Sequence, residues 1–410
     1  MTVIHLATAR LTAADRRAAG VALRKVVPRS GQGDWSPSTA RRDPVAILQA
    51  QSLSRIPHLV PVRYARMRPT PFTFLRGAAA VMAEDLANTP SAGLRVQSCG
   101  DCHLANFGSY ASPEGQPVFD INDFDETLPA PFEWDLKRLA TSLILAGIDR
   151  KMAASATHAL AEQAALAYGR AMNHLAGLAP LAAWSSQIDL AASIASIAKA
   201  RIRSAETRRL EAVLKNEKTA FGLVVHEGSG WRIRDKPPLI HHLAAHELPT
   251  RAWLEGYAAT LPPERRVLLE RYRLRDVAFK VVGVGSVGTF CAIGLFTDAD
   301  GYPLLLQIKE AQDSVLAPYA GPSVFTSQGE RVVVGQRMLQ ATSDIFLGWT
   351  KPPGQDRQFY VRRLKDSRLA AVGEMMESSM GFYAELCGRT LARAHARSGD
   401  PRSSRGSQLA

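Results

Sequence analysis

The chain has 410 residues, of which 46% are hydrophobic, and a formal net charge of +12. This length and apolar content allow two or three lobes with a substantial core and exclude a largely disordered chain. No apolar run approaches the roughly 18 residues of a membrane span, and no signal segment opens the chain, so we expect a cytoplasmic protein. The four cysteines are too few and too scattered for a disulfide scaffold.

Basic residues are concentrated at the two ends of the chain. Much of the positive charge lies before Arg42 and in the tail after residue 397. We expect residues 1–60 to be an N-terminal extension, partly disordered, and residues 398–410 to be a disordered tail. Basic and aromatic residues do not alternate in the stripe that is typical of nucleic-acid binding. The net charge therefore permits an anionic partner without indicating nucleic acid.

A second basic group precedes residue 98. It contains Arg63, Arg66, Arg68 and Arg76. Two interpretations stay open: these side chains solvate the surface, or some of them hold a phosphate or an anionic substrate.

The most informative segment runs from residue 98 to residue 139. Asp101 is followed five positions later by Asn106, and a Ser-, Pro- and Gly-rich turn then leads to a predicted strand that ends at Asp120. Phosphoryl transfer needs an acid that orients the acceptor hydroxyl, together with oxygen ligands for magnesium. Because Mg²⁺ takes few protein carboxylates plus phosphate oxygens, an Asn and an Asp are sufficient. The order of these residues predicts such a site.

Carboxylates are crowded around this predicted hairpin. The members are Asp101, Asp120, Asp123, Asp125 and Glu126. Each one alone is explained by turn formation, but together they repel one another unless a cation compensates. We therefore predict a metal or cationic site, with Asp120, Asp123 and Asp125 as alternative metal ligands beside Asn106.

The same segment contains Cys99, Cys102 and His103 in the spacing of a c-type haem attachment motif. Haem attachment is disfavoured because no export signal precedes it, and zinc is disfavoured because no second ligand pair follows. We expect His103 to brace the loop through hydrogen bonds.

The middle of the chain is predominantly helical by pattern. Residues 151–218 are Ala-rich with helical periodicity, residues 222–240 suggest a hairpin with a Gly-Ser-Gly turn, and residues 249–273 suggest another helix.

A glycine-rich loop lies between two predicted strands in residues 277–310. Gly283, Gly285 and Gly288 precede a β-branched and aromatic run, a hairpin, and a third strand that carries Lys309. Glycines let a loop backbone approach phosphates, and a Lys on a rigid strand can reach their oxygens. A dinucleotide-binding loop is the rival interpretation, with Glu310 as its acid, but that loop would open a helix.

The last predicted elements are a helix, a strand and a second helix. Residues 329–340 form the helix that contains Glu330, residues 358–364 form the strand, which we expect to lead to a hinge, and residues 374–397 form the long final helix.

These motifs resemble those of aminoglycoside and choline phosphotransferases, which have protein-kinase-like folds. GDCHLANFG, VFDINDFDE and EWDLKRLA are similar to their HGDxHxxN, IDFxD and DLA motifs, and LARAHA is similar to the helix before their catalytic loop. Longer strings over roughly residues 40–400 closely resemble an uncharacterised bacterial family, domain of unknown function 2252 (DUF2252).

The resemblance implies roles for particular residues. Asp101 would be catalytic with His103 beside it, and Asp135 would brace the loop. Lys309, paired with Glu330, would hold the phosphates of ATP under the glycine loop, and Arg76 would assist. Residues 151–218 would shape the acceptor pocket.

The implied fold is α+β, a two-lobe protein-kinase-like fold that is circularly permuted, because here the catalytic loop precedes the glycine loop. The implied division is a catalytic loop and helical lobe at 61–275, a β-rich nucleotide-binding lobe at 276–370, and a helix at 371–397 that packs on the helical lobe. The expected function is an ATP- and Mg-dependent phosphotransferase that acts on a small-molecule or anionic acceptor. Nucleotidyl (AMP) transfer and an inactive nucleotide-binding regulatory protein are the alternatives.

Overall fold

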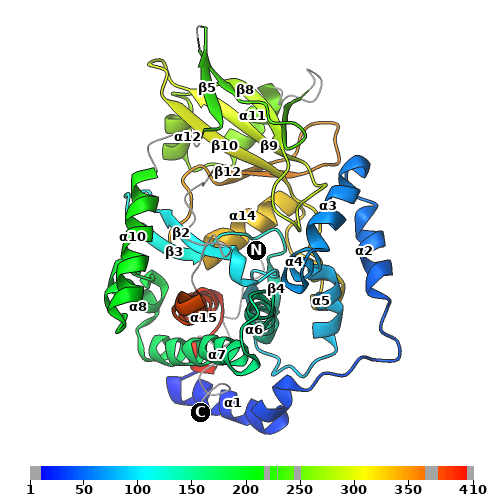
Figure 1. Cartoon of the computed structure of the whole chain (residues 1–410), viewed down its shortest axis with the longest axis vertical. Coiled ribbons are helices and arrows are strands. Elements are labelled where there is room, and N and C mark those ends of the chain that lie inside the picture. Colours follow the sequence, from blue (N-terminus) through cyan, green and yellow to red (C-terminus); the bar gives the residue numbers. More distant parts are fainter. Residues whose placement is uncertain (1–10, 217–221, 229, 244–250, 365–376, 404–410) are drawn as a thin grey trace.

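The computed structural model describes residues 11–216, 222–228, 230–243, 251–364 and 377–403. A sheet-rich part and a helical part lie one above the other, with α14 (Gln328–Leu339) between them (Figure 1). The expected α+β class is confirmed.

One antiparallel sheet of six strands forms the upper part, in the order β11-β12-β10-β9-β8-β7. Its strands are β7 (Ile240–His242), β8 (Arg273–Lys280), β9 (Cys291–Thr297), β10 (Pro303–Glu310), β11 (Gly348–Thr350) and β12 (Phe359–Arg363). Every residue of β9 is buried, because both faces of the sheet are covered. Trp253 and Tyr257 of α11 (Arg251–Ala259) pack on one face, and Val224 and Ile233 of the hairpin β5 (Val224–Glu227)–β6 (Gly230–Ile233) pack on the other.

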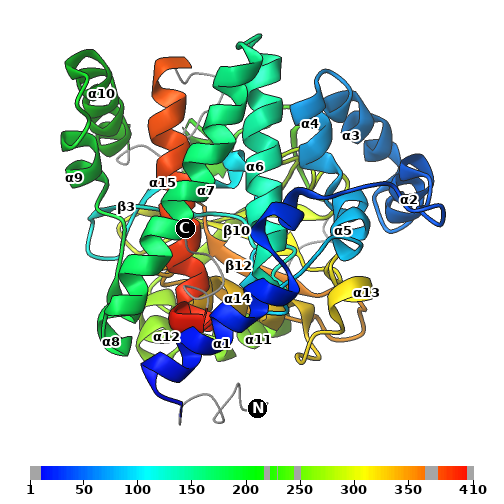
Figure 2. The same ribbon diagram turned by 90° about the horizontal axis from the view of Figure 1, so that it is seen from below.

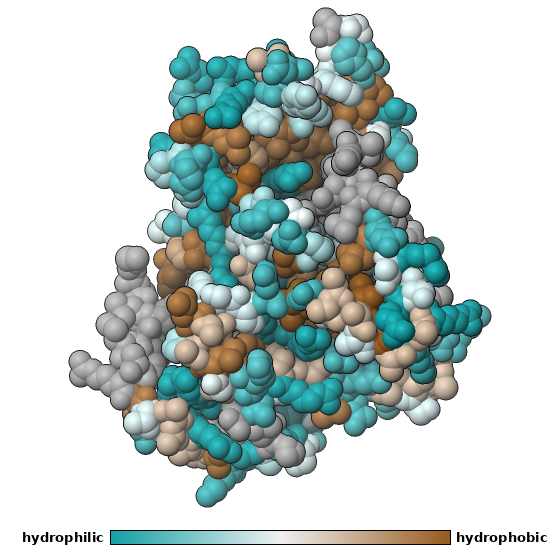
Figure 3. All heavy atoms as spheres, turned by 90° about the vertical axis from the view of Figure 1, so that its left-hand side faces the viewer, coloured by the Kyte–Doolittle hydropathy of each residue, from teal (hydrophilic) through white to brown (hydrophobic). Residues whose placement is uncertain are grey.

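Three long helices form the centre of the helical part: α6 (Phe132–Asp149), α7 (Ala154–Gly177) and α15 (Met380–Ser398). Figure 2 shows α15 running alongside α7. A glycine allows this close approach, since a Cβ atom at Gly388 would lie 2.2 Å from the carbonyl oxygen of Ala164. Three further helices follow α7: α8 (Pro180–Ser185), α9 (Leu190–Ala195) and α10 (Ala200–Asn216). The surface on the α8–α10 side is mostly hydrophilic, with hydrophobic residues in scattered groups (Figure 3).

The N-terminal region is helical in its described part. It contains α1 (Ala13–Val26), α2 (Pro44–Ser52), α3 (Val60–Met67), α4 (Pro71–Gly77) and α5 (Ala79–Ala87). Helices α2 to α5 flank the helical part on one side (Figure 1). Of the extension predicted at 1–60, residues 11–60 are described and contain α1 and α2, and of the tail predicted at 398–410, residues 398–403 are described. The remaining parts of both segments, and the hinge expected after residue 364, lie outside the described residues.

Two short strand pairs hold the segment singled out by its acidic residues. β1 (Arg95–Ser98) pairs with β4 (Leu128–Pro131), and β2 (Phe107–Ala111) pairs with β3 (Pro117–Ile121). Both pairs are antiparallel. The first pair therefore brings residues 99 and 127 close together, so the whole acidic segment forms one compact loop system.

Most predicted elements are present, with one clear difference. The helix expected at 249–273 is two helices, α11 and α12 (Pro263–Leu269), because Pro262 and Pro263 interrupt it. The strand β8 then begins at Arg273. Within the described residues, no helix combines the length and apolarity that a membrane span requires.

Candidate active site

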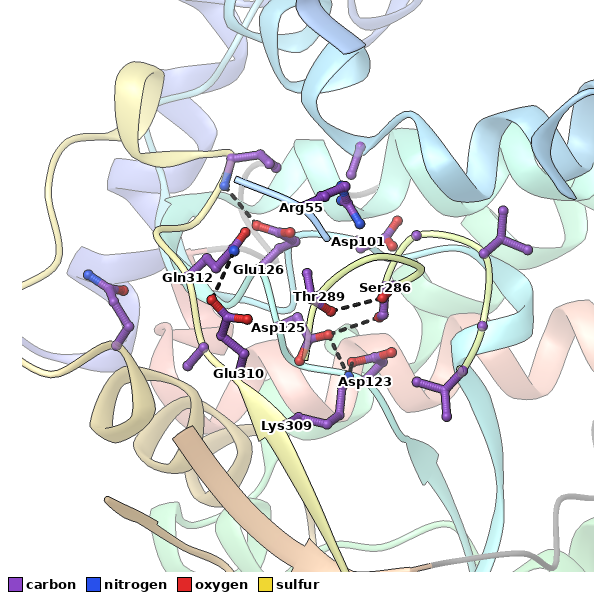
Figure 4. A pocket seen from close by; sticks show the side chains of 18 of the residues that line it. Arg55, Asp101, Asp123, Asp125, Glu126, Ser286, Thr289, Lys309, Glu310 and Gln312 are labelled. Atoms are coloured by element: carbon purple, nitrogen blue, oxygen red, sulfur yellow. Dashed lines mark hydrogen bonds and ion pairs between the residues drawn. The ribbon is translucent and has the colours of Figure 1, made fainter. Parts of the chain in front are cut away.

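A cavity of about 1320 Å³ is lined by residues from both the sheet and the helical part. Figure 4 shows how its side chains converge. The predicted site residues that line it are Arg76, Asp101, His103, Asn106, Asp123, Asp125, Gly283, Gly285 and Lys309. Residues from four distant stretches of sequence therefore share one cavity, which is the usual setting of a ligand site.

Lys309 of β10 is held by two aspartates. Its Nζ atom lies 2.5 Å from Oδ2 of Asp125 and 3.5 Å from Oδ1 of Asp123. The hydroxyl of Tyr360 donates to the other oxygen of Asp125 at 2.6 Å. Burial alone would lower the pKa of Lys309, but the negative charges of Asp123 and Asp125 raise it well above its ordinary value. Lys309 is therefore a fixed cation on the cavity wall.

The predicted ion pair between Lys309 and Glu330 does not form. Within the described chain, Glu330 makes no ion pair with Lys309, whose carboxylate partners are Asp123 and Asp125. The next residue, Arg331, points into the interior instead and donates to the carbonyl oxygens of Thr127 and Asp125 at 2.7 and 2.9 Å. Helix α14 thus anchors the backbone of the acidic loop, and the loop's own carboxylates are the nearer partners for the lysine.

Asp101 is oriented by an arginine that the sequence interpretation did not identify. Nε of Arg138, on α6, donates to Oδ1 of Asp101 at 2.6 Å. Nδ2 of Asn106 donates to the backbone carbonyl of Asp101 at 2.8 Å. Arg138 follows Asp135 by three residues, which places both on one side of the helix. This spacing in the sequence could have identified Arg138 as a partner of the loop that Asp135 was expected to brace.

His103 is buried beside Asp101. Its Nε2 atom lies 3.7 Å from Oδ2 of Asp101, and its ring meets Phe72 edge to face. Burial lowers the pKa of His103 to about 4, so the imidazole is neutral at physiological pH. Its Nδ1 atom has no hydrogen-bond partner among the described residues, and 3.7 Å from Nε2 to Asp101 is too long for a hydrogen bond, so the ring does not brace the loop through hydrogen bonds as expected.

Asp135 binds the backbone of the loop that carries Asp101. Its two oxygens accept from the amides of Cys99 at 2.8 Å and Gly100 at 3.0 Å. Nε2 of His395, on α15, lies 3.1 Å from the same carboxylate. Burial by itself would raise the pKa of Asp135, but the hydrogen bond and charge of His395 and the bonds from Ser98 and Cys99 lower it below its ordinary value. Gly100 has a φ of 81°, and a Cβ atom there would lie 2.3 Å from the carbonyl oxygen of Glu126.

Asp120 was predicted as a possible metal ligand, and the structure places it elsewhere. Its side chain is completely buried, forms an ion pair with Arg393 of α15, and accepts from the amide of Ala341 at 2.8 Å. Successive side chains of a strand point to opposite sides, so Asp120 at the end of β3 is directed into the interior. Of the three aspartates predicted as alternative metal ligands, Asp123 and Asp125, which follow the strand, line the cavity.

The glycine-rich loop folds against the N-terminal helices. The Gly283 carbonyl accepts from Nη1 of Arg66 at 2.7 Å, and the Gly288 carbonyl accepts from the Ile56 amide at 2.7 Å. Gly283 and Gly288 have φ values of 66° and 91°, which favour glycine. Gly288 lies at the end of the loop and does not line the cavity. Because strand β9 follows the loop, the dinucleotide-binding interpretation is wrong.

The oxygen atoms on this wall suit a magnesium ion that also binds phosphate. Asp123, Asp125 and Asn106 line the cavity, and the buried Oδ1 of neighbouring Asn122 has no hydrogen-bond partner in the described part of the chain. Mg²⁺ commonly takes one or two carboxylates and completes its shell with waters and phosphate oxygens, so these residues fit it.

A second set of potential metal ligands is buried in the same loop. Within the described residues, Cys99, Cys102 and Asp135 bring ligand atoms within 4.8 Å of one another. The carboxylate of Asp135 is already used by two amides and by His395. These contacts account for the burial of the Asp135 carboxylate without a metal ion.

Comparison with known proteins identifies the family of this chain. Neither the curated proteins nor the solved structures contain a significant match to this chain. A model of the family described as "Uncharacterized protein conserved in bacteria (DUF2252)" matches residues 55–409. This match spans most of the chain, which therefore belongs to the DUF2252 family.

Proposed function

We propose that the protein is an ATP- and Mg²⁺-dependent phosphotransferase of the kinase-like type, with a small-molecule acceptor. The observation that carries the proposal is the meeting of Lys309 with Asp123 and Asp125 in a cavity that Asp101, Asn106 and the glycine-rich loop also line. A fixed cation, hard oxygen ligands and an acid near one another are the parts that phosphoryl transfer needs.

Lys309 and the acidic loop would bind the phosphates of ATP. Asp125 pairs with Lys309 at 2.5 Å, and the Tyr360 hydroxyl donates to the same aspartate. Phosphate oxygens would compete for the ammonium group, while Asp123, Asp125 and Asn106 would hold Mg²⁺. The ion would offset the charge of the transferred phosphoryl group.

Asp101 would orient the acceptor hydroxyl. Arg138 binds one of its carboxylate oxygens, and the other lies toward His103. Because Arg138 fixes this carboxylate in place, we assign Asp101 chiefly to positioning the hydroxyl and receiving its proton during the transfer. Asp135 and the amides of Cys99 and Gly100 keep the loop in place.

The contact between the end of α15 and strand β1 supports the resemblance to a circularly permuted kinase. Oγ of Ser398, the last residue of α15, accepts from the amide of Gln97 in β1 at 2.8 Å. The helix that resembles the one before a catalytic loop therefore ends beside that loop, although about 300 residues separate them in the chain. A chain that ran directly from the end of α15 into β1 would have its motifs in the usual kinase order.

Incubation with ATP labelled at the α or the γ phosphate tests the proposal. We expect label from the γ position, and none from the α position, in a product formed with a bacterial small-molecule extract and Mg²⁺. Asp101→Asn should abolish transfer while retaining nucleotide binding, because its side chain faces the acceptor. Transfer of α label would establish nucleotidyl transfer instead, and nucleotide binding without any transfer would favour a regulatory protein.

A further inference from the structure

Among the residues that the structure describes, two buried arginines on the cavity wall have no carboxylate partner. Arg55 is 8% exposed and Arg63 is completely buried, and both line the cavity. In the part of the chain that the structure describes, neither forms an ion pair. A buried cation is costly unless an anion or several hydrogen bonds compensate for lost water.

The hydrogen bonds of these arginines use only part of their capacity. Nη1 of Arg55 donates to the carbonyl of Val287 at 2.5 Å, and Nη2 of Arg63 donates to Gln51 and to the carbonyl of Gly77 at 2.7 Å each. Nε of Arg55 and both Nε and Nη1 of Arg63 are buried without an acceptor among the described residues. These N–H groups can still bind an oxyanion.

The charges of the two arginines also act on each other. Burial, and then the nearby charge of Arg63, lower the pKa of Arg55 to about 10. The negative charge of Glu126, followed by the effects of Tyr64 and Asp125, opposes this lowering only in part. An anion bound to both guanidinium groups would relieve the repulsion and use the free donors.

Arg63 and the arginine that holds Asp101 bind the same helix, α4. Arg63 binds the carbonyl of Gly77 at the end of α4, and Arg138, which holds Asp101, binds the carbonyl of Leu75 in the same helix at 2.8 Å. In Figure 4, Arg55 is drawn near Asp101, and Lys309 is drawn across the cavity from it. Arg55 also binds the carbonyl of Val287 in the glycine-rich loop, so it lies between that loop and Asp101.

We propose that Arg55 and Arg63 form a subsite for an oxyanion carried by the acceptor, either a phosphate or a carboxylate group. This assignment rests on the proposed function. The planar fork of arginine matches both kinds of oxyanion in a bidentate way. The enzyme would then phosphorylate a hydroxyl compound that already bears a negative group, with that group fixed by the arginines and the hydroxyl beside Asp101.

Calorimetric titration of the full chain with inorganic phosphate, and separately with malonate, tests the subsite. The protein is first saturated with Mg²⁺ and a non-hydrolysable ATP analogue. We expect at least one anion to bind alongside the analogue, and Arg63→Gln or Arg55→Gln to weaken it by about tenfold or more, since each removes a charge-assisted bond. The analogue's affinity should change by less than about twofold. The better-bound anion identifies the group on the acceptor.

Arg68→Gln is the matched control, because Arg68 is an exposed arginine at the end of the helix that contains Arg63, and it should leave anion affinity unchanged. Equal anion affinities in all three variants, or anion binding that the analogue abolishes, would overturn the subsite. Thermal unfolding checks each variant. If Arg63→Gln does not fold, Arg55→Gln decides. If the analogue does not bind, the proposed function fails, while anion titration of the protein alone still tests the arginines.

Discussion

Nζ of Lys309 lies 2.5 Å from Oδ2 of Asp125, a residue 184 positions earlier in the chain. The contact joins the central strand β10 of the sheet to the acidic loop of the helical part. It replaces the expected contact with Glu330 and explains why a lysine that is 2% exposed stays charged. It also predicts which residues are energetically coupled.

Lys309→Met and Asp125→Asn should be strongly non-additive in the free energy of unfolding. Each variant alone breaks the same pair, so we expect a coupling energy of about 1 kcal/mol or more. A double-mutant cycle measured by urea unfolding gives the value. Glu330→Gln should be additive with Lys309→Met, and strong coupling of that pair would contradict the arrangement.

Lys309→Met should also lose the thermal shift that ATP and Mg²⁺ produce, whereas the control Lys351→Met, at an exposed lysine, should keep it.

Asp120 and Asp123 should behave in opposite ways. Asp120→Asn leaves Arg393 buried without its partner, so it should destabilise the fold by about 3–5 kcal/mol. Asp123→Asn should change stability much less and should remove the dependence of nucleotide binding on Mg²⁺. Urea unfolding and calorimetry with and without Mg²⁺ separate the two effects. A normally stable Asp120→Asn protein that no longer responds to Mg²⁺ would restore Asp120 as the metal ligand.

His103 should make the protein sensitive to mild acid. Its pKa is about 4 in the folded chain and about 6.5 when exposed, so the unfolded state takes up the proton first as the pH falls. The stabilisation is complete above about pH 6.5 and is lost as the pH falls from 6.5 towards 4, which amounts to about 3 kcal/mol. Urea unfolding across this window should show a smaller loss in His103→Gln than in the parent protein. Identical pH profiles would argue against a buried neutral histidine.

The four cysteines should be unreactive in the folded protein. Cys99, Cys102, Cys291 and Cys387 are each 1% exposed or less. Burial raises the pKa of the Cys102 thiol to about 11, and the reactive thiolate is therefore scarce. An aromatic disulfide reagent at pH 8 should label all four only after denaturation. Rapid labelling of Cys99 or Cys102 in the native protein would show that the loop carrying Asp101 opens.

Several features could be predicted from the sequence because they are local. The glycine loop leads into a strand because Cys291 to Thr297 is apolar with β-branched and aromatic residues, and the strand that carries Lys309 is a short apolar run after a turn. Turn residues mark the hairpin before Asp120, and helical periodicity marks α7 and α15. The shared site was not a local inference: the resemblance to kinases implied that Asp101, Asn106, Asp120 and Lys309 lie together, and all of these except Asp120 line one cavity.

Partner choice was decided only by the tertiary structure. Whether Lys309 meets Glu330 or Asp125, and whether Asp120 faces the cavity or Arg393, depends on how β10, α14 and α15 pack around the acidic loop. His395 reaches Asp135 across 260 positions of sequence, a contact that no local pattern encodes. The same holds for Arg55 and Arg63. The sequence shows that both side chains are charged, but their burial, and the lack of a carboxylate beside them among the described residues, result from the packing of distant segments.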